Sequence, residues 1–406
     1  MYPPHHYGGY ELSCQDVVER WRRRGHDVAV LTTDMRVPGV TDPPNERATG
    51  VWRDLRFYYA NGDLHVPPVW QRPGLERHNQ RTLAAALGRF QPDVVSLWHM
   101  GAMSFSLVTS LAERRVSLVC VVCDDWLSYG PEVDGWMRLF DGRRAAFRPA
   151  ARLAERVTGI PTHLPDLAAA ATFCFVSDST RRRAEEHARW PVGGAPVIPS
   201  GVAPEDFPRP DEAPGARPWQ WRLLFVGRLD PRKGIDTAVE ALANLPAETT
   251  LEVVGKGDDA YRLRLEGIAA DAGAAGRVRF SSARRSELGA RYRAANVLVF
   301  PVRWDEPFGL APLEAMASGT PVIATGTGGS GEFLADGVNS LLFAPGRADE
   351  LATAVRRLAD DAELRAALVR GGYDTAAHLT VDRQAADLEA LHLAAVARTT
   401  ERQSPA

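Results

Sequence analysis

Short apolar runs alternate with amphipathic stretches along this chain, which is the pattern of an α/β protein with buried parallel strands. The clearest run is Val297 to Phe300, which we expect to form a buried strand. Residues 308–318 carry apolar positions on one side, as a helix does, and Gly319 stands where that helix should end. A second strand is expected over 320–324, followed by a glycine-rich turn over 326–331. This strand–helix–strand pattern predicts a parallel sheet.

The same alternation continues through both halves of the chain. In the first half we expect strands at 27–33, 51–59, 93–98, 116–122, 172–177 and 195–201, and helices at 11–24, 75–90, 104–114 and 178–189. In the second half we expect strands at 222–226, 251–254, 278–281 and 340–343, and helices at 235–245, 287–294, 348–358, 362–368 and 381–397. A proline-rich, polar stretch separates the halves. These patterns predict domains at 1–207 and 219–380, a linker at 208–218, and a helical segment at 381–406.

Composition narrows the class of protein. A chain of 406 residues can build two full cores, and a net charge of -3 argues against a nucleic-acid partner. Of the 48 basic residues only Lys233 and Lys256 are lysines, so an arginine-rich run is weak evidence for a site. The four cysteines have neither metal-ligand nor disulfide-framework spacing, which favours a reduced cytoplasm. No apolar stretch approaches the roughly 20 residues of a membrane span, and no signal peptide is evident.

Two carboxylates, Glu306 and Glu314, bracket the turn between the first strand and its helix. On one helix they would lie roughly 12 Å apart, whereas the paired carboxyls of a glycosidase lie about 5 to 9.5 Å apart. Their spacing suits two ends of an elongated polar ligand, or simply a solvated loop glutamate and an ordinary helix glutamate. The backbone amides of Phe308, Gly309 and Leu310 would open the helix and could face an anionic phosphate.

The segment E-P-F-G-L-A-P-L-E-A-M-A-S-G-T-P-V-I-A, residues 306–324, resembles the E-x7-E segment of retaining GT-B glycosyltransferases, especially family 4. The resemblance implies two facing Rossmann-like domains, the first binding the acceptor and the second the nucleotide-sugar donor, with the active site in the cleft between them. It assigns contact with sugar hydroxyls to Glu306 and contact with the ribose to Glu314. It also implies that the segment 381–406 packs back on the first domain, and that neither a metal nor another cofactor is needed.

A second stretch, G-R-L-D-P-R-K-G-I from Gly227 to Ile235, follows an expected strand and enters a helix. Arg228 could grip a diphosphate with its two-pronged guanidinium, while Lys233 adds a point charge, although this side could simply be basic. The same word recurs in family 4, which implies that both residues hold the diphosphate. Gly255, in the word G-K-G-D, resembles the family's glycine loop near the nucleotide.

The start of the chain is unusual because a Pro- and Gly-rich loop, rather than a strand, leads into the first helix. In the resembling family a strand of about seven apolar residues comes first, and its Gly-Gly loop approaches the donor phosphate. The resemblance gives that role to Gly8 and Gly9, which on their own would indicate an ordinary turn. Since a central strand is costly to lose, we expect that Met1 is an internal methionine and that an apolar strand begins about ten residues earlier.

The word C-D-D-W, Cys123 to Trp126, ends the most apolar strand of the first half. Family 4 enzymes often carry a histidine, which reaches the donor sugar, where this chain has Cys123. That cysteine could equally be a small buried apolar residue. Asp124 or Asp125 could supply a polar contact instead, and His99 is another candidate for the sugar or acceptor pocket. Because a thiol is a weak donor, a 6-deoxy or otherwise modified hexose is one hypothesis for the donor sugar.

The expected function is transfer of a sugar from a nucleotide diphosphate sugar to an acceptor hydroxyl on a small molecule or lipid-linked glycan. The expected pathway is natural-product, exopolysaccharide or cell-envelope glycan biosynthesis. Residues 134–158 combine aromatics with arginines and could cover an acceptor, rest on the inner face of an anionic membrane, or cover a core. Two alternatives are a non-catalytic nucleotide-sugar-binding relative and a pyridoxal-phosphate enzyme of the same fold. The latter would need a Schiff-base lysine, and both lysines stand in words of another kind.

Overall fold

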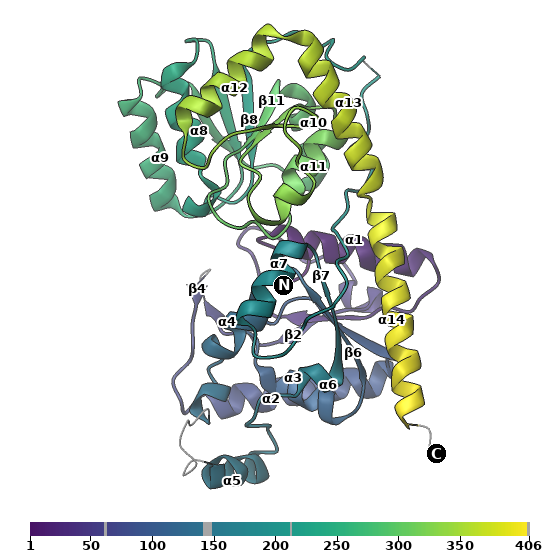
Figure 1. Cartoon of the computed structure of the whole chain (residues 1–406). Helices are drawn as coiled ribbons and strands as arrows, with labels where there is room; N and C mark the ends of the chain where they lie inside the picture. The colour runs from purple at the N-terminus through teal and green to yellow at the C-terminus, as the bar shows by residue number, and fades with distance from the viewer. Residues whose placement is uncertain (61–62, 141–147, 212, 404–406) are drawn as a thin grey trace. The chain divides into compact units, whose positions relative to one another are not determined.

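The computed structural model describes residues 1–60, 63–140, 148–211 and 213–403. It divides into two compact units, one of residues 1–198 with 385–406 and one of residues 199–384 (Figure 1). The expected boundary at 207 and the expected linker therefore fall inside the second unit. Among the described residues, no helix is both long enough and apolar enough to cross a membrane.

The second unit is built on one six-stranded parallel sheet in the order β10-β9-β8-β11-β12-β13. Its strands are β8 (Arg222–Val226), β9 (Thr250–Val254), β10 (Val278–Ser281), β11 (Val297–Phe300), β12 (Val322–Ala324) and β13 (Leu341–Leu342). The strand β11 forms as expected because all four of its side chains are buried. In β11–β12 pairing, Leu298 lies beside Val322 and Phe300 beside Ala324. The chain order reverses between β8 and β11, and ligands of open α/β sheets bind at such a point.

Helices cover both faces of this sheet, as the right-handed crossovers between parallel strands require. One face carries α8 (Ile235–Ala241), α9 (Asp259–Asp271) and α12 (Ala348–Asp360). The other carries α10 (Arg285–Ala294), α11 (Leu310–Ala317) and α13 (Ala362–His378), as Figure 1 shows. Gly319 has a φ of 70°, so it ends α11 in the left-handed conformation predicted for it.

The first unit holds its parallel strands in two separate sheets. One pairs β1 (Val30–Thr33) with β2 (Val51–Leu55), and the other has the order β5-β6-β7, with β5 (Val94–Leu97), β6 (Ser117–Val122) and β7 (Ala171–Phe175). A short antiparallel pair joins β3 (Tyr59–Ala60) to β4 (Asp63–Leu64). The strand expected at 195–201 is wrong, since Val197 makes only an isolated bridge to Phe175. Over the described residues no strand precedes the first helix, and the expected upstream strand stays a prediction.

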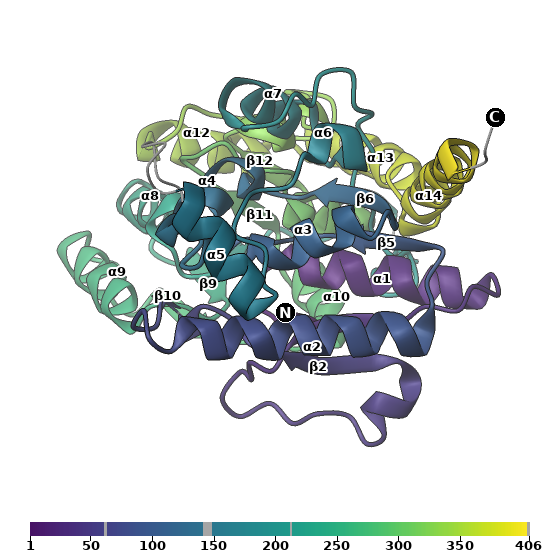
Figure 2. The ribbon, with the colours of Figure 1, turned by 90° about the horizontal axis from the view of Figure 1, so that it is seen from below.

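The helices of the first unit pack around these sheets. They are α1 (Gly9–Arg23), α2 (Arg72–Phe90), α3 (Phe105–Glu113), α4 (Trp126–Val133), α5 (Arg148–Thr158), α6 (Leu167–Ala170) and α7 (Asp178–His187). Figure 2 shows α2 running alongside β2. The strand β6 is buried along its whole length and centres a core that includes Trp126, Trp136 and Phe175.

The last helix, α14 (Val381–Gln403), belongs to the first unit from Ala385 onward. There the indole nitrogen of Trp21 donates to the carbonyl oxygen of Ala385 at 2.9 Å. Glu389 accepts from both Arg24 and His26, and the ring of His392 packs edge-on against Trp21. These contacts agree with the expectation that the C-terminal segment packs on the first domain.

Candidate functional site

The carboxyl ends of β8 and β9 carry two of the predicted glycines, in loops that touch backbone to backbone. Gly227 follows β8 and Gly255 follows β9. A Cβ placed on Gly255 would lie 1.9 Å from the carbonyl oxygen of Gly227, so no larger residue fits there. Gly234, at the start of α8, is equally close to the carbonyl oxygen of Pro301, again 1.9 Å from a placed Cβ. These contacts fix the relative positions of the loops that carry the charged candidates.

The two catalytic candidates Lys233 and Glu306 lie together in the second unit. The ammonium nitrogen of Lys233 is 2.6 Å from Oε2 of Glu306, and both side chains are mostly buried, at 15% and 12% exposure. Lys233 ends a short 3₁₀ turn (Pro231–Lys233), which brings it from the β8 side to the loop after β11. Arg228 is more open and lies 3.8 Å from a carboxylate oxygen of Asp230. Lys233 is therefore closely paired and mostly buried, whereas Arg228 is more exposed and more loosely paired.

Trp304 joins this cluster, although the sequence analysis did not single it out. Its indole nitrogen donates to Oε2 of Glu306 at 2.9 Å. Its ring lies under the guanidinium of Arg232 at 4.5 Å and near the ammonium of Lys233 at 5.6 Å. An aromatic residue two positions before Glu306, in a strand-to-helix loop, is the signal that could have revealed it. Trp304 orients the carboxylate and faces two cations with its ring.

The turn into α11 forms as predicted around Gly309, which precedes the helix with a φ of 96°. Leu310 is the first helical residue, and the side chain of Phe308 packs on Phe333. The glycine-rich turn supports this loop, since the amide of Gly329 donates to the carbonyl oxygen of Glu306 at 2.7 Å. The amides that could face an anion thus belong to a braced helix start.

Glu314 has a different partner from Glu306. It is 8% exposed, on α11, and its Oε2 accepts a hydrogen bond from the hydroxyl of Tyr292 on α10 at 2.7 Å. Burial raises the pKa of Tyr292 well above its usual value, and the neighbouring carboxylate adds to the effect. The hydroxyl therefore stays protonated and donates. No motif in the sequence indicates Tyr292.

In the first unit, Gly8 and Gly9 lie at the start of α1, where Gly8 is the N-cap. The carboxylate of Glu11 turns back to accept from the amides of Tyr7 and Gly8, at 3.2 Å and 3.1 Å. This contact neutralises the helix start electrostatically in the free protein. A donor phosphate at these amides would have to displace Glu11.

His99 and Asp124 form one polar cluster with two tyrosines. Nε2 of His99 lies 3.1 Å from Oδ2 of Asp124 and 3.0 Å from the hydroxyl of Tyr129, which also donates to Asp124 at 3.0 Å. The ring of Tyr10, on α1, stacks on His99 with centroids 4.8 Å apart. Burial opposes ionisation of Asp124, but His99 and the hydrogen bonds hold its pKa below the usual value. The structure thus joins two candidates and adds Tyr10 and Tyr129.

Cys123 stays outside that polar cluster. It is buried, its Sγ lies 3.8 Å from the carbonyl oxygen of Val121, and burial raises its pKa well above the usual value. A neutral buried thiol is the apolar alternative left open by the sequence. Asp125 is paired with Arg183 at 3.0 Å, so Asp124 is the aspartate that faces His99.

Residues 134–158 divide into a buried turn and an exposed helix. Asp134 is fully buried and accepts from three backbone amides, while Trp136 is buried and donates to the carbonyl oxygen of Pro161. The helix α5 exposes Leu153 and Val157, at 63% and 73%. The arginines and the phenylalanine at 143, 144 and 147 lie outside the described residues.

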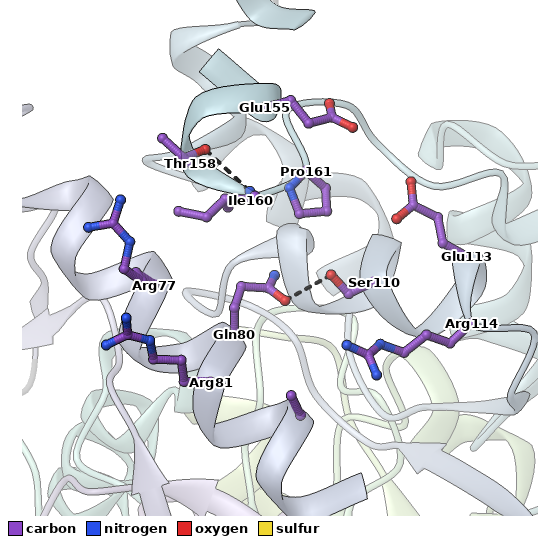
Figure 3. A pocket seen from close by; sticks show the side chains of 12 residues that line it. Arg77, Gln80, Arg81, Ser110, Glu113, Arg114, Glu155, Thr158, Ile160 and Pro161 are labelled. Atoms are coloured by element: carbon purple, nitrogen blue, oxygen red, sulfur yellow. Dashed lines mark hydrogen bonds between the residues drawn. The ribbon is translucent and has the colours of Figure 1, made fainter. Parts of the chain in front are cut away.

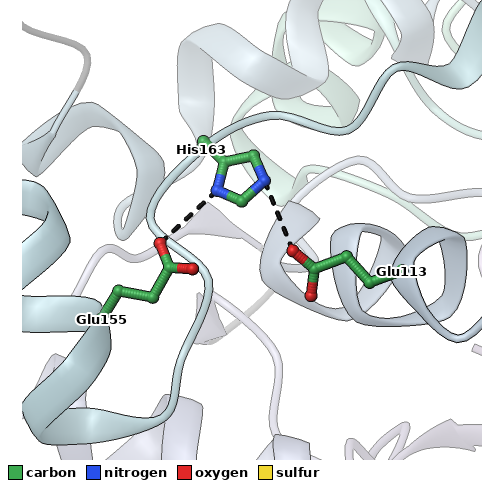
Figure 4. A group of neighbouring side chains, drawn as sticks. All are labelled: Glu113, Glu155 and His163. Atoms are coloured by element: carbon green, nitrogen blue, oxygen red, sulfur yellow. Dashed lines mark ion pairs between the residues drawn. The ribbon is translucent and has the colours of Figure 1, made fainter.

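Glu113, Glu155 and His163 are the acidic and imidazole groups closest to a metal-site arrangement in the described part of the chain. Figure 4 shows that the imidazole bridges the carboxylates, with Nε2 3.5 Å from Glu113 and Nδ1 3.5 Å from Glu155. One cation cannot be bound by both nitrogens of the same ring. The geometry therefore suits an imidazole that lies between two carboxylates better than a metal centre.

The fold and these loops define a class of protein, the GT-B glycosyltransferases. Sucrose-phosphate synthase from Thermosynechococcus elongatus has a similar structure, with a TM-score of 0.71, 23% identity, and coverage of 96% of this chain and 94% of that one. HepE of Anabaena, solved in complex with UDP-glucose, gives a TM-score of 0.67 at 22% identity, over 95% of this chain and 97% of that one. Both likenesses cover both units and establish the fold.

Sequence comparison gives the family. Residues 7–206 match the family model of Glycosyltransferase Family 4, and residues 208–375 match that of Glycosyl transferases group 1. The chain therefore belongs to the glycosyltransferases that these two models describe together.

Curated relatives resemble parts of the chain. A D-inositol 3-phosphate glycosyltransferase from Stackebrandtia nassauensis is 37% identical over 228 residues, which are 52% of this chain and 51% of that protein. The lipopolysaccharide core biosynthesis glycosyltransferase LpsE of Rhizobium meliloti is 36% identical over 154 residues, 38% of this chain and 44% of that protein. The chain spans about half the length of the curated relatives it matches.

Proposed function

We propose that this chain is a retaining glycosyltransferase that moves a sugar from a nucleotide diphosphate sugar to an acceptor hydroxyl. The observation that carries the proposal is an arrangement at the carboxyl edge of the six-stranded sheet, where Lys233 pairs with Glu306 and Arg228 lies in the loop after β8. It places two cations and an oriented carboxylate where open α/β sheets bind ligands. The complex of HepE with UDP-glucose supports a nucleotide-sugar donor.

The residues have separate roles in the proposed reaction. Arg228 and Lys233 stabilise the negative charge that develops on the departing diphosphate, as do the amides at the start of α11. Lys233 is released from Glu306 when the diphosphate arrives, and Glu306 then accepts hydrogen bonds from hydroxyls of the donor sugar. The carboxylate of Glu314 accepts from the ribose hydroxyls. In the first unit, Gly8 and Gly9 approach the donor phosphate, and His99 with Asp124 serves the sugar or acceptor pocket.

The acceptor is proposed to be a small molecule or a lipid-linked glycan, in natural-product, exopolysaccharide or envelope glycan biosynthesis. Contact with an anionic membrane surface belongs to the same proposal, because α5 exposes Leu153 and Val157 beside Arg152 and Arg156. No cofactor enters the proposed chemistry.

The test incubates purified protein with UDP-, GDP- and dTDP-sugars and analyses the acceptors by mass spectrometry. Arg228→Ala and Lys233→Ala should each lower turnover about 30- to 1000-fold, which corresponds to about 2–4 kcal/mol. The matched control is Arg264→Ala, because Arg264 is an exposed cation of the same unit, on α9, with no role in the proposed site. Equal turnover in all three variants at saturating donor would disprove the assignment. Nucleotide binding without transfer or hydrolysis would instead identify a non-catalytic relative.

A further inference from the structure

A hollow in the first unit, separate from the cluster around His99, is lined by residues that the proposed reaction does not use. Its volume is about 580 Å³, which is within the range of small-molecule pockets. Figure 3 shows its walls, formed by α2, by the end of α3, and by the end of α5 with the segment that follows it. Ala84, Ile160 and Pro161 give it an apolar part.

Three arginines bring positive charge to this hollow. Arg77 and Arg81 lie one turn apart on α2, and Arg114 directly follows α3, so that Figure 3 shows guanidinium groups on two sides. In the described ranges, none of the three guanidinium groups has a hydrogen-bond or ion-pair partner. Like charges at this helical spacing repel one another. An anion between them would remove that repulsion.

In the described ranges, the nearby polar side chains form no ion pair with these three arginines. Glu113 and Glu155 line the hollow, but each is turned to the imidazole of His163 at 3.5 Å (Figure 4). The amide of Gln80 donates to Ser106 and accepts from Ser110, so this part of the wall is neutral.

We propose that this hollow binds a phosphate-bearing ligand through Arg77, Arg81 and Arg114. A guanidinium presents two parallel N–H donors that match the oxygens of a phosphate. The apolar and amide surfaces of the hollow leave room for the rest of the ligand, such as a glycerol or a sugar. The site does not depend on the proposed transfer reaction, because it shares no residue with the cluster around Glu306 or with the cluster around His99.

The experiment titrates the full chain with inorganic phosphate and with glycerol 3-phosphate, followed by the side-chain Nε–Hε NMR signals of arginine. All proteins carry Arg228→Ala and Lys233→Ala, which removes the other candidate phosphate ligands. In this background we expect saturable shifts of three arginine signals. The triple variant Arg77→Gln, Arg81→Gln, Arg114→Gln should lose those signals and weaken binding at least tenfold.

The control replaces three exposed arginines outside the hollow, Arg264, Arg357 and Arg370, by glutamine. It removes the same total charge and should bind like the background protein. If both triple variants bind the phosphates equally weakly, the effect comes from net charge alone and the proposal is overturned. Arginine signals whose shifts never saturate would overturn it as well. Circular dichroism and melting of both variants separate loss of binding from loss of folding.

Vesicles distinguish the two sources of the phosphate. Sedimentation with phosphatidylglycerol vesicles, compared with phosphatidylcholine vesicles, measures binding to a lipid headgroup. If the three pocket arginines are needed for sedimentation, the ligand is a lipid headgroup; if only the soluble phosphates depend on them, it is a free phosphate ester. Pocket and control variants that behave alike with every probe contradict the site.

Discussion

At the scale of single residues, Trp304 contacts three charged groups of the candidate site. It donates to Glu306 and offers its ring to Arg232 and Lys233. Since the indole N–H points at the same carboxylate oxygen that Lys233 approaches, it can keep that carboxylate in place when the lysine turns to another anion.

Trp304→Phe tests this positioning role, because it keeps a ring and removes the N–H donor. The lost charge-assisted hydrogen bond is worth about 1.5–3 kcal/mol, so kcat should fall roughly 10- to 100-fold while KM changes little. Trp304→Ala should also raise KM, since both cations lose their ring contact. Steady-state kinetics measures both constants, with the donor that the panel of nucleotide sugars selects. An unchanged kcat in Trp304→Phe would leave Trp304 a packing residue.

Glu314 and Tyr292 give a second prediction at this scale. Tyr292→Phe removes the hydroxyl that donates to the buried carboxylate, and an unsatisfied buried group costs about 1–3 kcal/mol of folding stability. Glu314→Gln should weaken nucleotide diphosphate binding as well, because it alters the oxygen proposed to meet the ribose. The melting temperatures and the nucleotide affinities of both variants test these two expectations. If Glu314→Gln changes melting alone, Glu314 is only a structural residue.

At the scale of elements, a buried carboxyl joins α2 to α3. Glu76 on α2 is fully buried, accepts from Ser106 on α3 at 2.7 Å, and is also bonded to the hydroxyl of Tyr58. Burial raises the pKa of Glu76 to about 7 from 4.5, despite these hydrogen bonds. Burial also raises the pKa of the nearby Asp134. Deprotonation of either acid therefore lowers the stability of the folded protein.

This raised pKa predicts how stability depends on pH. Below about pH 4.5 Glu76 is protonated in both the folded and unfolded protein and causes no penalty. As pH rises from 4.5 to 7, the unfolded chain releases the proton first, so the free energy of unfolding falls; above 7 the loss is complete. The difference in unfolding free energy between wild type and Glu76→Gln, measured by denaturant titration, should change by a few kcal/mol across this interval. A difference that is constant with pH would contradict the prediction.

The sequence predicts elements best where their pattern is purely apolar. The strand at 297–300, which is apolar at all four positions, has the expected bounds. The stretch 195–201 resembles a strand, but its residues pair with β7 at one position only. Pairs such as Tyr292 with Glu314, or Tyr10 with His99, could not be predicted, because packing of one element on another brings them together. Motifs identify charged and glycine positions, whereas aromatic partners depend on tertiary contacts.

At the scale of the whole molecule, the chain leaves the first unit at Ile198 and returns to it at Ala385. The part of α14 that returns accepts a hydrogen bond from the indole nitrogen of Trp21. It also pairs Glu389 with Arg24 and His26. The folding of the first unit therefore depends on residues that follow the entire second unit.

Truncation after Gln384 should selectively destabilise the first unit, because it exposes Trp21 and removes its hydrogen-bond acceptor. We expect a lower melting temperature for that unit and an unchanged transition for the second unit, as measured by calorimetry. Truncation after Gln403 is the matched control and should melt like the full chain. If both truncated chains melt alike, the C-terminal helix contributes little to the first unit.

The glycine contacts around the six-stranded sheet have a consequence for protein engineering. Gly255 touches the carbonyl of Gly227 and Gly234 touches that of Pro301, each through backbone alone. Loops fitted in this way cannot be exchanged one at a time, since any added carbon displaces the neighbouring chain. A designer who grafts another enzyme's donor specificity onto this scaffold would have to transplant the loops after β8, β9 and β11 as one block. Chimaeras with a single foreign loop should accumulate as insoluble protein, while the three-loop chimaera stays folded.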